Sequence, residues 1–200
     1  MKKALSSLAL AALASVAAPA AQAAIIPMYA VLNGASESPA NASPGTGLAG
    51  FVLDTVLHTL KIQFTYSGLL APTTSAHIHC CTASPNTGTS GVATPAPAFA
   101  GFVLGNTSGS FDATFDLTLA SSYLPSFVTN NGGTAAGAEA ALVAGLTSNR
   151  TYLNIHTAAP LGVPSGEIRG FITVPEPISL GLVGIALAAA ALSLRRRPSA

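Results

Sequence analysis

Short runs in which apolar and polar residues alternate occupy the middle of this chain, and they constrain its fold more than any other feature. The clearest run is Leu60–Tyr66, in which every second side chain is apolar. Such alternation places the apolar side chains on one face of a β-strand. On this basis we predict strands at Met28–Leu32, Gly47–Leu53, Leu60–Tyr66, Ala76–Cys80, Ala98–Leu104, Ser110–Leu117, Thr151–His156 and Glu167–Thr173.

The segments between these runs favour turns, with one exception. Most are rich in Gly, Pro, Ser, Thr and Asn, which turns prefer. Ala135–Leu146 is instead rich in Ala and follows Asn-Asn-Gly-Gly, so we predict one short helix there. Residues 81–97 form a long polar loop, and loops of this length are often functional or mobile. About eight strands with one inserted helix predict an all-β sandwich or barrel over residues 24–173.

The amino terminus has the three parts of a secretory signal. Two lysines precede the apolar run Ala4–Ala18, and small residues surround a cleavage site at Ala23. We predict a signal peptide over residues 1–23 that is cleaved after Ala23. An uncleaved membrane anchor is the alternative, but an apolar run of about 15 residues is shorter than the roughly 20 that a spanning helix needs.

The carboxyl terminus carries a second apolar run, residues 178–194, which is followed by Arg195, Arg196 and Arg197. As a helix this run is about 25 Å long, which is enough for a thin bilayer. We predict a transmembrane helix over residues 178–194. Because basic flanks stay in the cytoplasm, both ends place the intervening domain outside the inner membrane.

The charge of the middle segment excludes one class of function. Residues 24–174 contain three basic and six acidic side chains, which gives a net charge of −3. A protein that binds nucleic acid by neutralising phosphates needs a basic stripe, so we expect no nucleic-acid partner. The sequence also lacks a Gly-x-Ser-x-Gly motif and a phosphate-binding loop. We therefore expect a domain without catalytic residues.

Three histidines are candidates for a metal site. His77 and His79 are two residues apart in a predicted strand, so both side chains lie on the same face. His156 ends another predicted strand, and three imidazoles with one open position suit Zn or Cu. Glu167 is a candidate fourth ligand or supporting partner. We favour the alternative, a structural polar cluster in which these histidines form hydrogen bonds to backbone and side chains. His58, by contrast, is expected in an exposed hairpin turn.

Two further pairs of residues attract attention. Cys80 and Cys81 are adjacent, and export implies an oxidising compartment. They can form a vicinal disulfide, which we favour, or intermolecular bridges, or they can join the metal site as thiols.

Glu167 and Arg169 are two residues apart in the last predicted strand. A charge that faces a sheet interior needs a partner, so we expect a structural polar network around both.

The C-terminal segment resembles a known sorting signal. Pro175-Glu176-Pro177, the apolar run and Arg195-Arg196-Arg197 follow one another in the order of the PEP-CTERM signal of Gram-negative bacteria. A plain tail anchor is the alternative interpretation. The resemblance implies processing by an exosortase-type enzyme at the inner membrane, in bacteria that produce exopolysaccharide.

The middle segment resembles the CHRD domain family, first recognised in the developmental inhibitor chordin. The resemblance implies an all-β, immunoglobulin-like sandwich or barrel without an established enzymatic activity. This sequence departs from the family pattern at Cys80-Cys81 and in the Ala-rich insert. The resemblance is carried by Leu32–Pro39 (Leu-x-Gly-x-x-Glu-x-Pro), Gly45–Gly47, Tyr66–Leu69, Ala76–His79, Tyr152–Thr157 and Pro164–Gly170.

Three functions are compatible with these observations. We expect an exported, non-catalytic domain that is transiently anchored in the membrane, then reaches the cell surface or the medium, and binds exopolysaccharide or a matrix protein. The first alternative is a small Cu- or Zn-binding protein or metalloenzyme that uses His77, His79 and His156. The His-x-His strand is similar to that of copper–zinc superoxide dismutase, although the rest of that ligand set is missing. The second alternative is a structural matrix component without a specific ligand.

Overall fold

The computed structural model describes residues 25–161 and 166–175. The predicted signal peptide 1–23, its cleavage site at Ala23 and the predicted transmembrane helix 178–194 lie outside these residues. So do most of the sorting motif and the arginines Arg195, Arg196 and Arg197.

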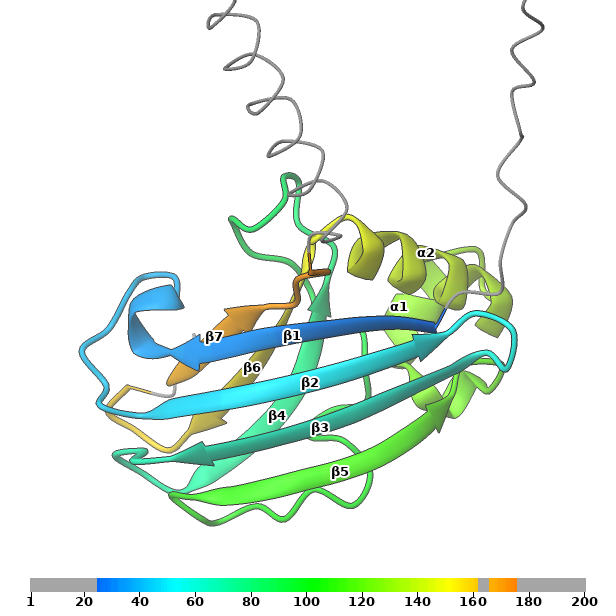
Figure 1. The fold of residues 1–200 in the computed structure, drawn as a ribbon. Helices are drawn as coiled ribbons and strands as arrows, with labels where there is room; N and C mark the ends of the chain where they lie inside the picture. Colours follow the sequence, from blue (N-terminus) through cyan, green and yellow to red (C-terminus); the bar gives the residue numbers. More distant parts are fainter. Residues whose placement is uncertain (1–24, 162–165, 176–200) are drawn as a thin grey trace, which may run out of the picture.

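The described residues form one antiparallel sheet that curls over itself (Figure 1). Its strand order is β4-β6-β7-β1-β2-β3-β5, so β4 and β5 are the two edges. Strands β4 and β6 lie behind β1, β2 and β3, which gives the layered arrangement of a sandwich or partial barrel. The strands are β1 (Ile25–Asn33), β2 (Thr46–Asp54), β3 (Thr59–Ser67), β4 (Thr73–Cys80), β5 (Gly109–Asp116), β6 (Thr151–Thr157) and β7 (Ile168–Phe171).

Alternation along each strand produces the core inside the curl. In β3, Leu60, Ile62 and Phe64 are buried, whereas Gln63 and Thr65 between or beyond them are exposed. Phe64 lies at the centre of an aromatic cluster, with its ring centroid 5.3 Å from that of Phe111. The all-β class predicted from the sequence is therefore confirmed.

The predicted strand Ala98–Leu104 is wrong. This segment makes only one isolated bridge, between Ala98 and Ala76, and then turns. The amide of Phe102 donates to the carbonyl of Phe99, and Gly101 adopts a φ of 85°. The turn directs both phenylalanine rings into the core, where they contact Phe64. The apolar residues that suggested a strand thus belong to a loop, and its two phenylalanines pack against the core of the curled sheet.

The predicted helix is confirmed and a second one was not foreseen. Helix α2 spans Ala135–Thr147, and the Thr134 hydroxyl caps it by accepting from the amide of Gly137. Helix α1 (Pro125–Asn130) is too short to show a periodic pattern in the sequence. Two 3-10 turns, η1 (Gly34–Ser36) and η2 (Ala120–Ser122), complete the set. None of the helices in the described residues is both long and apolar enough to cross a bilayer.

The close approach of β7 to β1 gives a test of this packing. A Cβ atom at Gly170 would lie 2.3 Å from the carbonyl oxygen of Val31, which cannot move without disturbing the sheet. We expect Gly170→Ala to lower the free energy of unfolding by about 2–3 kcal/mol. The matched control is Gly50→Ala, where nothing lies within 4 Å of the added atom. Urea unfolding of both variants measures the difference, and equal stabilities would contradict this packing.

Candidate metal centre

The pairing of β4 with β6 brings the three predicted histidines together. In this register His77 lies opposite Asn154, His79 opposite Tyr152, and His156 opposite Ser75. The intervening pairs, such as Ile78 with Leu153, point into the core. The histidines therefore share the other face of these two strands, and β7 adds Arg169 beside Asn154.

The three imidazoles are close enough to bind one metal ion. Their candidate ligand atoms all lie within 4.8 Å of one another. The ring centroid of His77 is 4.7 Å from that of His79 and 4.8 Å from that of His156. Zn–N bonds of about 2.0–2.1 Å in tetrahedral geometry need nitrogens about 3.3 Å apart. Small side-chain rotations would therefore bring the three nitrogens to coordination distance.

The orientation of His79 is fixed by a backbone carbonyl and by a neighbouring ring. Its Nδ1 lies 2.8 Å from the carbonyl oxygen of Ser90, so Nδ1 carries the proton and donates. The Nε2 atom is then the acceptor, and it is buried without a hydrogen-bond partner among the described residues. The ring also stacks on Tyr152, with centroids 4.5 Å apart and planes 8° apart. A backbone carbonyl that fixes the tautomer of a histidine is the usual support of a metal ligand.

His77, the other histidine on β4, is buried and neutral. Its side chain is buried, and its Nδ1 has no hydrogen-bond partner among the described residues. Burial, together with the neighbouring His79 and His156, lowers its pKa to about 3. Burial likewise lowers the pKa of His79 to about 4, although the hydrogen bond that its ring donates to the Ser90 carbonyl opposes this shift. Both imidazoles are therefore neutral at physiological pH, which is the form that binds metal.

Arg169 supports the site from the next strand. Its Nη1 donates to the carbonyl oxygen of Gly88 over 3.1 Å, and its Nε donates to that of Ser36. The guanidinium lies over the ring of Tyr152, 4.7 Å from the centroid, on which His79 also stacks. Arg169 thus holds loop 81–97 and Tyr152 in place around the histidines, and its charge helps to lower the pKa of His79.

A buried carboxyl group accompanies Arg169. Glu37 lies in the turn after η1, with its Oε2 3.9 Å from the Nε of Arg169. Burial raises the pKa of Glu37 to about 7, and the charge of Arg169 counteracts only part of that rise. The sequence showed Glu37 only as part of a family motif, and no local pattern indicates that it is buried beside Arg169.

Glu167 does not join the histidines. Its Oε1 accepts from the hydroxyl of Ser43 over 2.6 Å and from the amide of Leu70 over 2.7 Å. Its Oε2 accepts from the hydroxyl of Thr157 over 2.6 Å. Glu167 and Arg169 therefore belong to two separate hydrogen-bond networks, and their side chains share no partner among the described residues. The role of Glu167 is to tie two loops to the end of β6.

The two cysteines lie at the start of loop 81–97, away from the histidine group. The structure joins Cys80 and Cys81 in a vicinal disulfide. Both sulfur atoms face α2, at 3.8 and 3.5 Å from the carbonyl oxygen of Ala141. They also line a cavity of about 270 Å³ beside Gly91 and Phe127. No thiol is thus placed to serve as a ligand beside the three histidines in the described part of the chain.

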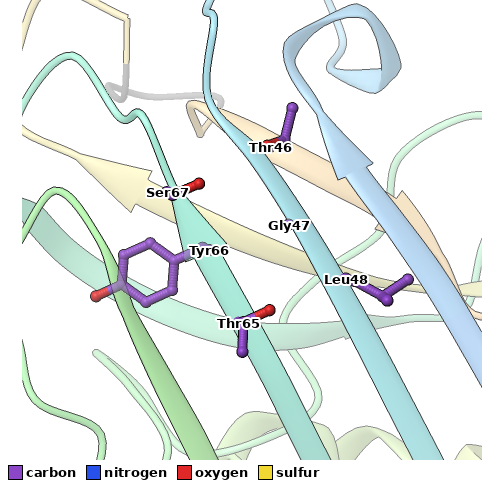
Figure 2. Close-up of a pocket in the computed structure, with 6 residues that line it drawn as sticks. All are labelled: Thr46, Gly47, Leu48, Thr65, Tyr66 and Ser67. Carbon is purple, nitrogen blue, oxygen red and sulfur yellow. The ribbon is translucent and has the colours of Figure 1, made fainter.

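The remaining candidates also lie elsewhere. His58 is in the turn between β2 and β3, exposed as expected, with its Nδ1 2.6 Å from the Oε1 of Glu139 on α2. Figure 2 shows a pocket between the start of β2 and the end of β3. Its lining residues are uncharged: Thr46, Gly47, Leu48, Thr65, Tyr66 and Ser67. The histidine cluster is therefore the group with metal-binding chemistry in the described structure.

Comparison with known protein families gives two matches. The model of the CHRD domain matches residues 28–172, and that of the PEP-CTERM protein-sorting motif matches residues 173–197. The first covers most of the chain and ends where the second begins. No curated protein and no solved structure matches the chain.

The depressed pKa of His77 predicts how the metal-free domain responds to acid. The unfolded chain takes up this proton near pH 6.5, whereas the folded domain resists protonation until about pH 3. Stability from His77 is therefore complete above pH 6.5 and is lost as the pH falls below it. When the pH falls from 7 to 4, we expect the protonation linked to His77 to lower the free energy of unfolding by on the order of 3 kcal/mol.

Comparison with a His77→Gln variant isolates this effect. Glu37 has a raised pKa and therefore changes stability in the opposite direction, losing its contribution as the pH rises toward 7. That contribution is the same in both proteins and cancels in the difference. Urea unfolding from pH 7 to pH 4 should show the smaller loss in the variant, and parallel curves would contradict the prediction.

Proposed function

Because the chain belongs to the CHRD domain family and carries a PEP-CTERM sorting motif, we propose that it is an exported, non-catalytic protein that binds Cu or Zn. The ligands are His77, His79 and His156. One observation carries the proposal, namely that the candidate ligand atoms of these three side chains converge within 4.8 Å.

The sorting motif determines where the protein acts. It means that the chain is exported across the inner membrane, anchored there transiently and processed by an exosortase. The protein then reaches the cell surface or the extracellular space. A metal site on this protein would therefore be exposed to the metal ions of the periplasm and of the extracellular space.

The chemistry of the histidines favours a metal over a purely structural cluster. A buried polar atom without a partner costs about 1–3 kcal/mol, so a structural cluster should satisfy its own nitrogens. His77 Nδ1 and His79 Nε2 are buried and lack hydrogen-bond partners among the described residues. A bound ion would satisfy both, and a set of three histidine ligands suits Zn or Cu.

We assign this site to binding rather than to catalysis. Both matched families are non-enzymatic, and neither carboxylates nor thiols belong to the ligand group among the described residues. When bound, the metal would supply an open coordination position for an outside ligand. The protein's own contribution is to hold the three imidazoles together, with the tautomer of His79 fixed by the Ser90 carbonyl and its ring stacked on Tyr152.

A second proposal concerns a partner in the extracellular matrix. The outer face of β1 and β2 exposes Tyr29, Val31 and Leu48, at 47%, 55% and 61% of their surface. Beside them lies an open groove of about 530 Å³ that is lined by polar side chains such as Gln63 and Asp112, together with Leu48 and two phenylalanines. An aromatic side chain next to hydrogen-bonding groups supports the binding of a matrix polysaccharide or matrix protein at this face.

Metal content tests the first proposal. Protein produced in a periplasm and purified without chelator should contain about one Cu or Zn ion per chain by elemental mass spectrometry. His77→Ala/His79→Ala should lose it, because one imidazole alone cannot chelate a metal ion. The matched control is His58→Ala, which removes an exposed histidine outside the cluster and should retain the metal. Absence of metal from all three proteins, even after incubation with Cu or Zn, would refute the site.

Truncation of Tyr29 tests the second proposal. We expect Tyr29→Ala to weaken binding of the mature domain to the producing bacterium's exopolysaccharide or matrix proteins by about tenfold. Val103→Ala, at an exposed apolar residue of the loop between β4 and β5, should leave binding unchanged. Cosedimentation with purified polysaccharide and with a matrix protein fraction separates the two partner classes. Equal binding by both variants would exclude this face.

A further inference from the structure

Four large apolar side chains are exposed at one end of the domain. They are Ile25, Val56, Leu57 and Leu119, with 66%, 57%, 68% and 51% of their surface accessible. Ile25 pairs with Asp54, the residue before the turn that contains Val56 and Leu57. Leu119 is two residues after Leu117, whose amide donates to the carbonyl of His58 in the same turn. The four residues therefore belong to one apolar tip, built around the β2–β3 turn.

The chain leaves the domain on the same side as this apolar tip. Thr173 pairs with Tyr29 of β1, and the amide of Val174 donates to Oδ1 of Asn149, just beyond the end of α2. The opposite half of α2 reaches the apolar tip through the contact between Glu139 and His58. Glu139 and Asn149 are ten residues apart along the chain, and the helical stretch between them, which ends at Thr147, is about 12 Å long. Figure 1 shows the β2–β3 turn and α2 at the same end of the sheet.

The sequence places a membrane anchor directly after this exit. Residue 175 is the last one described, and the apolar run begins at residue 178. Three residues of extended chain span about 10 Å at most. While the protein is anchored, the chain exit beside Asn149 therefore stays within about 10 Å of the bilayer, which brings the apolar tip, at the opposite half of α2, within reach of the lipid surface.

From these observations we propose that the apolar tip inserts into the lipid surface while the chain is anchored. The partner of this exposed patch is the lipid of the outer leaflet of the inner membrane. Apolar side chains exposed beside a bilayer gain by entering its interface. The contact would restrict the orientation of the domain before the sorting motif is cut, and it does not depend on the metal site.

The charges near the apolar tip indicate an apolar contact rather than an electrostatic one. Asp54 accepts from the amides of Val56 and Leu57, and Asp116 accepts from Thr118. Glu139 is paired with His58. These groups are acidic and engaged locally, so anionic lipids should not strengthen the contact.

Tryptophan fluorescence provides a direct test, because the chain contains no Trp. Leu57→Trp places a single reporter in the apolar tip. Val103→Trp is the matched control, since Val103 is equally exposed, at 68%, in the loop whose Gly105 amide binds Thr73 at the far end of β4. The full chain of each variant is anchored in phosphatidylcholine vesicles through its own C-terminal segment.

We expect the Leu57→Trp emission to shift to the blue and to be quenched at least threefold more by brominated lipid than that of Val103→Trp. Replacing a third of the lipid by phosphatidylglycerol should not increase the quenching. Water-like emission without quenching in both variants would overturn the proposal. A blue shift without lipid quenching would also overturn it, because the tip would then be covered by protein. Val56→Ser in the Leu57→Trp background should reduce the quenching while the unfolding midpoint stays unchanged.

Discussion

The antiparallel register between β4 and β6 is the constraint on which the rest of this structure depends. It pairs Ile78 with Leu153 on the core face and places His77 and His79 on the other face, beside His156. Because side chains alternate in a strand, a slip of one residue would move the histidines into the core and the apolar residues out of it. Burial of the core face therefore fixes the positions of the histidines.

The surroundings of the histidines then explain their chemistry. Loop 81–97 returns to β4 through the bond from the Cys80 amide to the Gly91 carbonyl, which places the carbonyl of Ser90 against His79. Arg169 fixes the same loop at Gly88 and covers Tyr152. Burial lowers the pKa values of His77 and His79, so both imidazoles are neutral and each has a nitrogen lone pair available.

Local patterns allowed much of the fold to be predicted, but not the contacts between distant segments. Alternation revealed strands such as Leu60–Tyr66, and Ala-rich composition revealed α2, because both signals are contained in a few adjacent residues. The same reasoning failed at Ala98–Leu104, where two phenylalanines enter the core from a turn. The alternation along β4 did predict that His77 and His79 lie on one face. Local patterns could not show that β6 is the neighbour of β4, nor that the Glu167 carboxylate accepts hydrogen bonds from Ser43 and Thr157. Those facts depend on the pairing of strands far apart in the chain.

X-ray absorption at the metal edge tests the central claim most directly. Protein loaded with one equivalent of Cu or Zn should show three nitrogen scatterers of imidazole type at about 2.0–2.1 Å, with one further light atom. His156→Ala should reduce the imidazole contribution by one. A sulfur scatterer at about 2.3 Å would assign the metal to the cysteines instead. A shell of oxygen atoms alone would mean that the metal binds outside the cluster, and either result would contradict a site built on the shared face of β4 and β6.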